Sequence, residues 1–298
     1  MGYSSSENLI IDLIIIITNS LSLTGNLFII TIFVSSSSVR SYAFKLVVYM
    51  SIADTVRSIG FLLPVTTNAL CIAQAVLTNY GSLSGIIWTS IIAFSIYTVV
   101  VLELENIQSY EKFTIIIGFI LPFCIALLPF TTNSYGAAEG WCWIKLDDFE
   151  ILWRMGAFYI IVFIVILFNT VMYYKVNQEL KIDIGYLRGS QHDISEKTNV
   201  HTRFRVYPLI IMICYVPVLV KRILEISSGS EYFALTAVSA VFMSGVGVLN
   251  AIAYGLTDNV KELLCKPFRR SSSYMTNETA VNDGLVNEVN DDLTLTDD

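Results

Sequence analysis

Charged residues are scarce in this chain. Only 14% of its 298 residues are Asp, Glu, Lys or Arg, against about 25% in an average soluble domain. Hydrophobic residues make up 54%, and the mean hydropathy is +0.64. No basic surface is present, because 18 Lys and Arg face 25 Asp and Glu. This composition disfavours a soluble domain and gives no footprint of nucleic-acid binding.

Signatures of a metal centre or of redox chemistry are also lacking. The five cysteines include no Cys-x-x-Cys pair, and the two histidines, His192 and His201, fall in one polar loop. A metal-dependent membrane hydrolase needs ligands within its helices. We therefore predict no metal, no cofactor and no catalytic residue, and we do not expect an enzyme.

The sequence lacks the features that are typical of two other classes of membrane protein. A retinal protein needs a lysine in its last helix, and the apolar segment 232–256 has none. Many transporters show inverted repeats, whereas no repeat is visible here. Asp12, Asp54 and Arg57 are the ionisable groups that we place deep in apolar segments. A polytopic transporter or channel remains the alternative function.

Seven long apolar segments are present instead. When the connecting loops are short, only helices can satisfy the backbone hydrogen-bonding groups of such segments in lipid. The sequence therefore predicts an all-α membrane protein, with a bundle of seven transmembrane helices within residues 1–257. The apolar segments are 9–34, 42–66, 71–102, 113–130, 151–174, 206–226 and 232–256.

The distribution of Lys and Arg predicts the orientation. With the N-terminus outside, only Lys145, Arg154, Lys221 and Arg222 of the 18 bases lie on the outer side, and Arg57 lies within the bilayer. The positive-inside rule then favours a cytosolic C-terminus. Residues 258–266 are expected to form an amphipathic helix on the membrane surface. Residues 267–298 are expected to be a disordered, acidic cytosolic tail.

Several polar residues fall within the predicted helices. Asp54 and Arg57 share one helix face. They form either a structural ion pair, or a polar switch (Asp54) next to a ligand site (Arg57). Asn26 and Asn250 are expected to join Asp54 in a polar cluster. Its hydrogen bonds either only hold the helices together or rearrange as a switch. Pro217 interrupts the sixth helix, and the resulting kink is either static or a hinge.

Three of the bases on the predicted outer side, together with the intramembrane Arg57, form a candidate ligand site, and two cysteines also lie on the outer side. Arg57, Arg154, Lys221 and Arg222 suggest an electropositive mouth for an anionic ligand. The alternative for Lys221 and Arg222 is that they extend to lipid headgroups. Cys71 and Cys142 both face the oxidising side, so they are either a disulfide or two free thiols.

Six sequence features, taken together, resemble a known family. They are TGN at 24–26, SIAD at 51–54, Cys71, GWCWI at 140–144, YPLIIMICYVP at 207–217 and GVLNAIAYG at 247–255. The set resembles the cyclic-AMP-receptor-like (class E) branch of G-protein-coupled receptors, with some similarity to fungal glucose-sensing receptors. The resemblance spans residues 9–266.

This resemblance implies a multi-pass receptor of the plasma membrane. Its expected partners are a small extracellular ligand, such as cyclic AMP or another anion, and a heterotrimeric G protein, with no nucleic acid. The resemblance also implies a disulfide between Cys71 and Cys142. The expected switch residues are Asn26, Asp54, Pro217, Asn250 and Tyr254.

One feature departs from rhodopsin-like receptors, whose third helix ends in an acidic–Arg–Tyr motif. Here the corresponding region contains Glu103 and Glu105 but no Arg, which disfavours a rhodopsin-like assignment. We expect Glu103 or Glu105 to meet Arg203 or Arg205 at the foot of the sixth helix, in the region that contacts the G protein. Cys265 is a candidate for S-palmitoylation.

Overall fold

The computed structural model describes residues 4–37, 40–104, 106–138, 140–186, 206–228 and 232–255. The chain divides into two compact units, Met1–Tyr254 and Gly255–Asp298. Apart from Gly255, every described residue belongs to the first unit. The predicted surface helix 258–266 and the predicted tail 267–298 lie outside the described residues.

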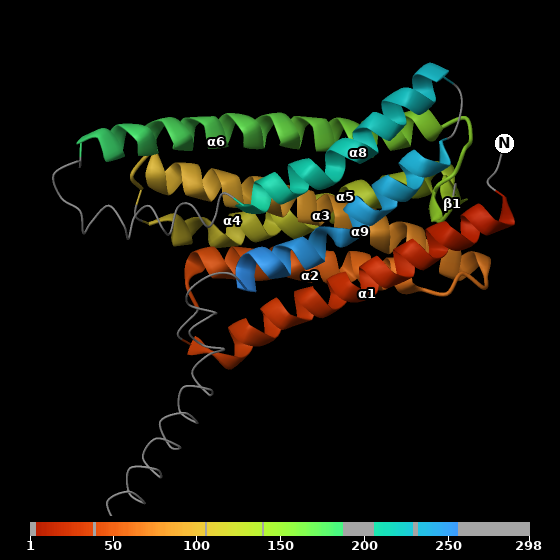
Figure 1. The fold of residues 1–298 in the computed structure, drawn as a ribbon, viewed down its shortest axis with the longest axis horizontal. Coiled ribbons are helices and arrows are strands. Elements are labelled where there is room, and N and C mark those ends of the chain that lie inside the picture. Colours follow the sequence, from red (N-terminus) through yellow and green to blue (C-terminus); the bar gives the residue numbers. More distant parts are fainter. Residues whose placement is uncertain are drawn as a thin grey trace, which may run out of the picture. The chain divides into compact units, whose positions relative to one another are not determined.

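The described part of the first unit consists of helices that join into seven rods (Figure 1). Two rods are composite, because short 3₁₀ and π-helical pieces continue directly into α-helices. In chain order the rods are α1 (Ser5–Ser35); α2 (Tyr42–Leu62); α3 (Asn68–Val100); η2 (Ile107–Tyr110), α4 (Glu111–Ile115), η3 (Ile116–Ile120), α5 (Leu121–Leu127) and η4 (Leu128–Thr132); η5 (Ile151–Tyr159) and α6 (Ile160–Tyr186); α8 (Val206–Ser228); and α9 (Phe233–Gly255).

Five of the described rods are long and apolar enough to cross a membrane. They are Ser5–Ser35, Asn68–Val100, Ile107–Thr132, Ile151–Lys181 and Phe233–Ala253. The other two rods, α2 and α8, have 21 and 23 residues. Both carry ionisable side chains that lower their hydropathy, among them Asp54 and Arg57 in α2, and Lys221 and Arg222 in α8.

The largest difference from the predicted boundaries concerns the fifth rod. We expected its apolar segment to end at residue 174. Instead α6 continues to Tyr186. Residues 175–181 read KVNQELK, and Lys, Gln, Glu and Leu have high helix propensity. The helix therefore continues after the apolar run has ended.

Helix α3 is the central element of the bundle. It packs against α2, α5, α6 and α8. Close packing against α2 depends on two glycines one turn apart, Gly81 and Gly85. Small residues four apart let membrane helices approach closely. The sequence GSLSG at 81–85 thus brings α3 against the polar part of α2.

Proline shapes the fourth rod. Pro122 has no N–H, so the carbonyl of Gly118, four residues earlier, loses its helical partner. The Ser84 hydroxyl on α3 donates a hydrogen bond to this carbonyl at 2.6 Å. Gly118 also lies against the Trp88 ring, at a point where a Cβ would be only 2.3 Å from Trp88 Cε2. The π-helical turn η3 is therefore held against α3 by contacts from both residues.

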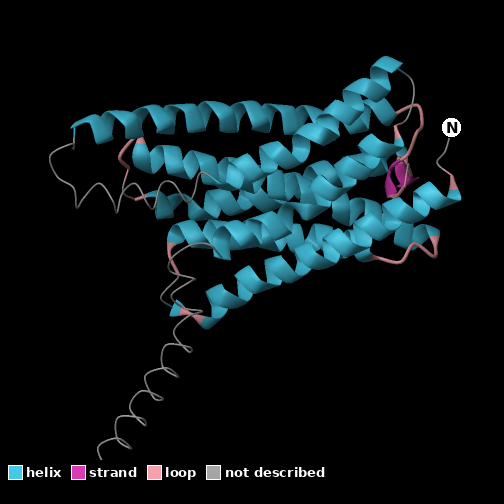
Figure 2. Ribbon diagram, in the orientation of Figure 1, coloured by secondary structure: helices cyan, strands magenta, loops and turns pink. Residues whose placement is uncertain are grey.

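A short antiparallel hairpin connects the fourth and fifth rods. Its strands are β1 (Tyr135–Ala137) and β2 (Cys142–Ile144), with Tyr135 opposite Ile144 and Ala137 opposite Cys142. The hairpin lies at the same end of the bundle as the start of α1 (Figures 1 and 2). Gly140, in the hairpin turn, adopts a left-handed φ of 84° and lies beside Ile11 of α1.

Candidate functional site

The hairpin is tied to the start of α3. Cys71 and Cys142 form a disulfide with a Cα–Cα distance of 5.3 Å, which confirms the predicted pair. One turn along α3, the Gln74 side-chain oxygen accepts a hydrogen bond of 2.8 Å from the Cys142 backbone N–H. Strand β2 is therefore fixed to α3 by a covalent bond and a buried hydrogen bond.

A second set of hydrogen bonds holds the side chains of the hairpin. Asn79 of α3 donates to the Tyr135 hydroxyl at 2.9 Å and accepts from the Trp143 indole N–H at 3.2 Å. The Tyr135 hydroxyl in turn donates to the Ala126 carbonyl at 2.7 Å. Burial raises the pKa of the Tyr135 phenol, so it remains a neutral donor. These bonds fix the orientation of Trp143.

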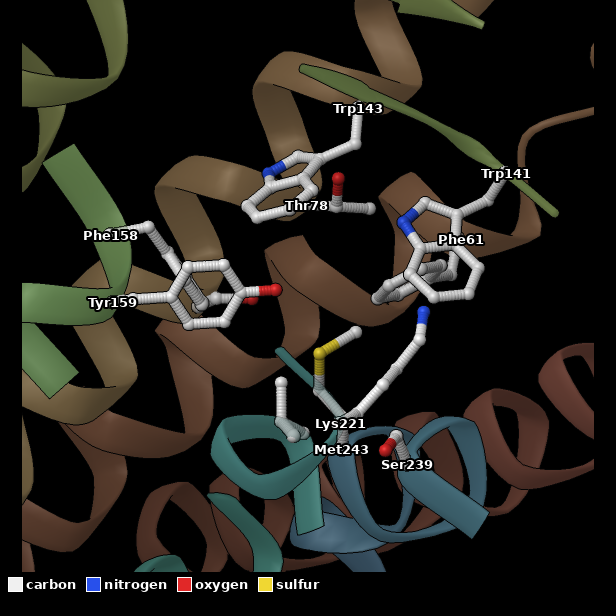
Figure 3. Close-up of a pocket in the computed structure, with 11 residues that line it drawn as sticks. Phe61, Thr78, Trp141, Trp143, Phe158, Tyr159, Lys221, Ser239 and Met243 are labelled. Carbon is white, nitrogen blue, oxygen red and sulfur yellow. The ribbon is translucent and has the colours of Figure 1, made fainter. Parts of the chain in front are cut away.

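Beneath the hairpin lies a cavity of about 40 Å³ (Figure 3). This is room for roughly three water molecules, since each needs ~10–15 Å³. Aromatic rings form most of its wall, and the polar groups of the lining side chains are four hydroxyls, two indole N–H groups and one ammonium. The lining residues are Phe61, Thr78, Ser82, Trp141, Trp143, Phe158, Tyr159, Val218, Lys221, Ser239 and Met243.

Lys221 supplies the ammonium. Its side chain extends from α8 towards Trp141 (Figure 3), and Nζ lies 5.7 Å from the centroid of the Trp141 ring. Glu225, one turn further along α8, pairs with Lys221 at 3.2 Å. Lys221 is 8% exposed, so it points into the protein instead of extending to headgroups.

Arg154 and Arg222 are engaged by a carboxylate next to the cavity. Glu150, just before η5, accepts from Arg222 at 2.6 Å and pairs with Arg154 at 3.1 Å. Arg154 also donates two hydrogen bonds, of 2.6 and 3.0 Å, to the Ile144 carbonyl of β2. Glu225 lies 3.6 Å from Arg222. These ion pairs connect the C-terminal half of α8 to η5 and the hairpin.

The four predicted ligand-binding bases therefore occupy three different environments. Lys221 lines the cavity, Arg154 and Arg222 share Glu150, and Arg57 pairs with Asp54. Only Lys221 is among the residues that line this cavity. The predicted four-base mouth is not assembled around it, because Arg57 pairs with Asp54, and Arg154 and Arg222 pair with Glu150, which the sequence analysis did not assign to them.

Asp54 and Arg57 form a buried ion pair in the middle of α2. The distance from Arg57 Nη1 to Asp54 Oδ1 is 3.2 Å, and each side chain is 1% exposed. Tyr215 and Cys214 of α8, both buried, lie near Arg57. On the other side, Asn250 of α9 donates to Asp54 Oδ2 at 3.2 Å. The pair thus contacts both α8 and α9.

The predicted polar cluster is assembled in part. Asp54 and Asn250 are hydrogen-bonded, whereas the Asn26 amide has no hydrogen-bond partner among the described residues. Asn26 lies beside Gly247 of α9, where an added Cβ would be 2.7 Å from its amide nitrogen. The α1–α9 contact includes other bonds, from Asn19 to Ser244 Oγ at 2.9 Å and from Ser22 to the Ser244 carbonyl.

Of the remaining predicted residues, Pro217 lies in the middle of a rod, Glu103 lies just beyond the end of one, and the others lie outside the described part. Pro217 lies inside α8, as expected. Glu103 is exposed just beyond α3, with a left-handed φ of 51°. Glu105, Arg203, Arg205 and Cys265 lie outside the described residues, and so does the side chain of Tyr254.

The sequence analysis missed the aromatic wall and the two α3 glycines. A usable signal existed for each. Trp141 and Trp143 are two residues apart in an extended segment, and alternate residues of such a segment face the same side. They therefore face the cavity together, while Cys142 between them faces α3. Gly81 and Gly85 have the spacing of close helix contacts.

Comparison with known proteins identifies the family. The profile of the slime mold cyclic AMP receptor matches residues 3–257. The chain belongs to this receptor family. G-protein coupled receptor 1 of Arabidopsis thaliana is 24% identical over 88% of this chain and 83% of its own length. Cyclic AMP receptor-like protein A of Dictyostelium discoideum is 23% identical over 83% of this chain and 64% of its own length.

The family's fold is also evident in solved structures. The crystal structure of squid rhodopsin superposes with a TM-score of 0.72 and 14% identity, covering 91% of this chain and 88% of that one. This likeness concerns the fold alone. The chain is thus a membrane receptor of rhodopsin-like fold, and its relatives are named as receptors, in agreement with the prediction that it is not an enzyme. The similarity to fungal glucose-sensing receptors stays a prediction.

Proposed function

We propose that this receptor transmits the binding of a small extracellular ligand to a heterotrimeric G protein from the plasma membrane. In this proposal the N-terminus and the hairpin are outside and the C-terminus is cytosolic. The ligand enters the cavity beneath the hairpin, and its anionic group contacts Lys221. Cyclic AMP, which is named in several relatives, is the first ligand to test.

One observation supports this proposal above the others: α8 contacts both the cavity and the buried ion pair. Val218 and Lys221, after Pro217, line the cavity. Cys214 and Tyr215, before Pro217, lie near Arg57. Proline weakens the helix at this point, because one backbone hydrogen bond is missing. A ligand that moves Lys221 therefore acts on the same helix that packs against Arg57.

The G protein is expected to bind at the other end of the rods. There, Glu103 or Glu105 pairs with Arg203 or Arg205 in the resting receptor, and the inner end of α8 moves when the ligand binds. Asp54, Asn250 and Tyr254 rearrange between the two states, and Asn26 gains a partner. The ligand drives this shift only through a difference in its affinity for the two states.

The test is a G-protein dissociation reporter in cells that express the receptor at their surface. Cyclic AMP is applied first, followed by other small anions, to the wild type, Lys221→Met and Lys145→Met. Lys145 is the matched control, because it is an outer lysine that does not line the cavity. We expect a ligand-dependent signal that Lys221→Met loses and Lys145→Met retains.

Two results would count against the proposal. A receptor at the cell surface that gives no basal or ligand-dependent signal argues against G-protein coupling. Surface labelling of a C-terminal tag in intact cells contradicts the proposed orientation.

A further inference from the structure

A second pocket, much larger than the cavity beneath the hairpin, lies at the end of the bundle where α1 begins. Its volume is about 610 Å³, within the range of roughly 300–1,000 Å³ that is usual for small-molecule sites. Its walls are formed by one face of α1 between Asn8 and Ile16, by residues 61–65 at and beyond the end of α2, by Gln74 of α3 and by the turn of the hairpin. Most of the lining side chains are apolar. This space is named the α1 pocket.

Asp12 carries the only charge among the described residues that line the α1 pocket. It is exposed, and it interrupts an apolar run of α1, IIDLIIII at 10–17. The other acid of α1, Glu7, is engaged in the capping box with Ser4. In the part of the chain that the structure describes, no residue forms an ion pair or a hydrogen bond with the Asp12 carboxylate.

An unpaired carboxylate in a membrane helix is costly, and such groups usually face a cavity or a partner. Asp12 is therefore suited to a cation that comes from outside the chain. One carboxylate on an apolar wall does not suit a metal ion, because Ca²⁺ and Mg²⁺ require about six or more oxygen ligands. An organic ammonium needs only one anionic partner, since the rest of the molecule can contact apolar and aromatic side chains.

Phe61 and Trp141 separate the α1 pocket from the cavity beneath the hairpin, because both residues line both spaces (Figure 3). Their ring centroids are 6.3 Å apart, in an edge-to-face arrangement. On the cavity side the charged lining group is Lys221, whereas in the α1 pocket it is Asp12. The two neighbouring spaces therefore present opposite charges, and a cation favours the α1 pocket.

We propose that the α1 pocket binds a small organic amine. The ammonium of the ligand pairs with the Asp12 carboxylate, and its apolar body lies against the apolar lining. This inference goes beyond the proposed function, because it assigns a second ligand site, on a different helix and for a ligand of the opposite charge.

Direct binding to the purified receptor in maltoside micelles, whose headgroups carry no amine, tests this inference without a G protein. The probe is radiolabelled 2-phenylethylamine. Unlabelled 2-phenylethanol is the neutral competitor of the same shape, and phosphatidylethanolamine is a competitor that carries a primary ammonium on a lipid. We expect the alcohol to compete about three- to tenfold more weakly than the unlabelled amine, since it lacks the charge-assisted hydrogen bond.

Variants then locate the ammonium. Asp12→Asn keeps the shape of the side chain and is expected to abolish the preference for amine over alcohol. Asp12→Glu keeps the charge and should retain that preference, which maintains a test if Asp12→Asn does not fold. The matched control is Asp148→Asn, because Asp148 is exposed and does not line the pocket. This control should bind the amine like the wild type.

Two further variants distinguish the α1 pocket from its neighbour. Ala138→Leu places a larger side chain in the lining of the α1 pocket, so the amine and the alcohol should both bind several-fold more weakly. Lys221→Met changes the cavity and should retain amine binding. A loss of amine binding in Lys221→Met would place the ligand in the cavity and overturn the inference.

Three other outcomes would also overturn it: equal binding of amine and alcohol, an unchanged preference for the amine in Asp12→Asn, or no saturable binding of the amine. If phosphatidylethanolamine displaces the probe at a lower concentration than the unlabelled amine does, the occupant is a lipid headgroup and the free amine is wrong. The proposed function fails separately, in the G-protein reporter, because the binding measurement requires no coupling.

Discussion

Gly81 of α3 lies against Arg57 of α2, so closely that a Cβ on Gly81 would be 2.6 Å from the Arg57 backbone nitrogen and 2.7 Å from its Cβ. One turn further, a Cβ on Gly85 would be 3.0 Å from Asp54 Oδ1. The two glycines therefore leave the space in which the buried ion pair forms. The contact between α2 and α3 and the charges of α2 depend on each other.

Gly81→Ala tests this dependence. The added methyl group meets backbone atoms that cannot rotate away, so α2 and α3 must separate. We expect a loss of about 1–3 kcal/mol in the free energy of unfolding, as for other over-packed sites, measured as a lower thermal midpoint in nanodiscs. Gly245→Ala is the control, because nothing lies within 4 Å of a Cβ there. Equal stability of the two variants would contradict the close contact.

The Asp54–Arg57 pair makes a second prediction. Asp54→Asn leaves the Arg57 charge without its carboxylate, and Arg57→Met leaves the Asp54 charge without its guanidinium. Removing one partner of a buried pair costs about 3–5 kcal/mol. The double variant buries no charge, so we expect it to recover most of that loss. Thermal midpoints of the four proteins give the coupling energy.

Additive losses in this cycle would mean that the two charges do not stabilise each other. Asn250→Leu provides the companion measurement, because it removes the amide that donates to Asp54 at 3.2 Å. An interhelical hydrogen bond in a membrane protein is worth about 0.6 kcal/mol on average. The expected effect is thus much smaller than that of either charge removal.

The third prediction concerns Ser84 of α3 and Pro122 of α5, which both affect the hydrogen bonding of the Gly118 carbonyl. Ser84→Ala removes the donor to the Gly118 carbonyl, and we expect a loss of about 0.6–1.7 kcal/mol. In a protein with Pro122→Ala, residue 122 has an N–H that bonds to this carbonyl within the helix. Ser84→Ala should then cost less. If it costs the same in both backgrounds, the hydroxyl does not replace the missing helical bond.

The disulfide makes a fourth prediction. It closes a loop of 71 residues between Cys71 and Cys142, and a crosslink of this kind stabilises a protein by about 2–4 kcal/mol. Cys71→Ala, Cys142→Ala and the double variant should lower the thermal midpoint by the same amount. Cys124→Ala is the control, since Cys124 is an exposed free thiol. A larger loss in the double variant would show that the two residues act separately.

Local features of the sequence were sufficient for much of the fold. Long apolar runs predict the rods because lipid requires a helical backbone, and the structure describes a rod at each of the seven predicted positions. The i, i+3 spacing of Asp54 and Arg57 places them on one helix face, where they pair. The predicted end of the fifth rod was wrong, because hydropathy indicates where a segment leaves the lipid. Helix propensity, by contrast, determines where the helix itself ends.

The arrangement of the cavity depended on contacts that are distant in the sequence. Glu150 is 72 residues from Arg222, so no local pattern indicates that they pair. Counting bases predicted a mouth with four positive charges, because Glu150 and Glu225, which engage Arg154, Arg222 and Lys221, were not assigned to them. The partner of a buried charge is determined by how the rods pack, and packing cannot be inferred from one sequence by charge counting.

The attachment of the hairpin also has a kinetic consequence. Because Cys142 is bonded to α3 and flanked by Trp141 and Trp143, the cover of the cavity cannot swing open as a loop does. In the proposed function, a ligand that passes the hairpin therefore needs the indole side chains to rotate or a neighbouring rod to shift. We therefore expect slow association and a long residence time, so that the duration of a signal follows the rearrangement of two tryptophans more closely than the affinity of the ligand.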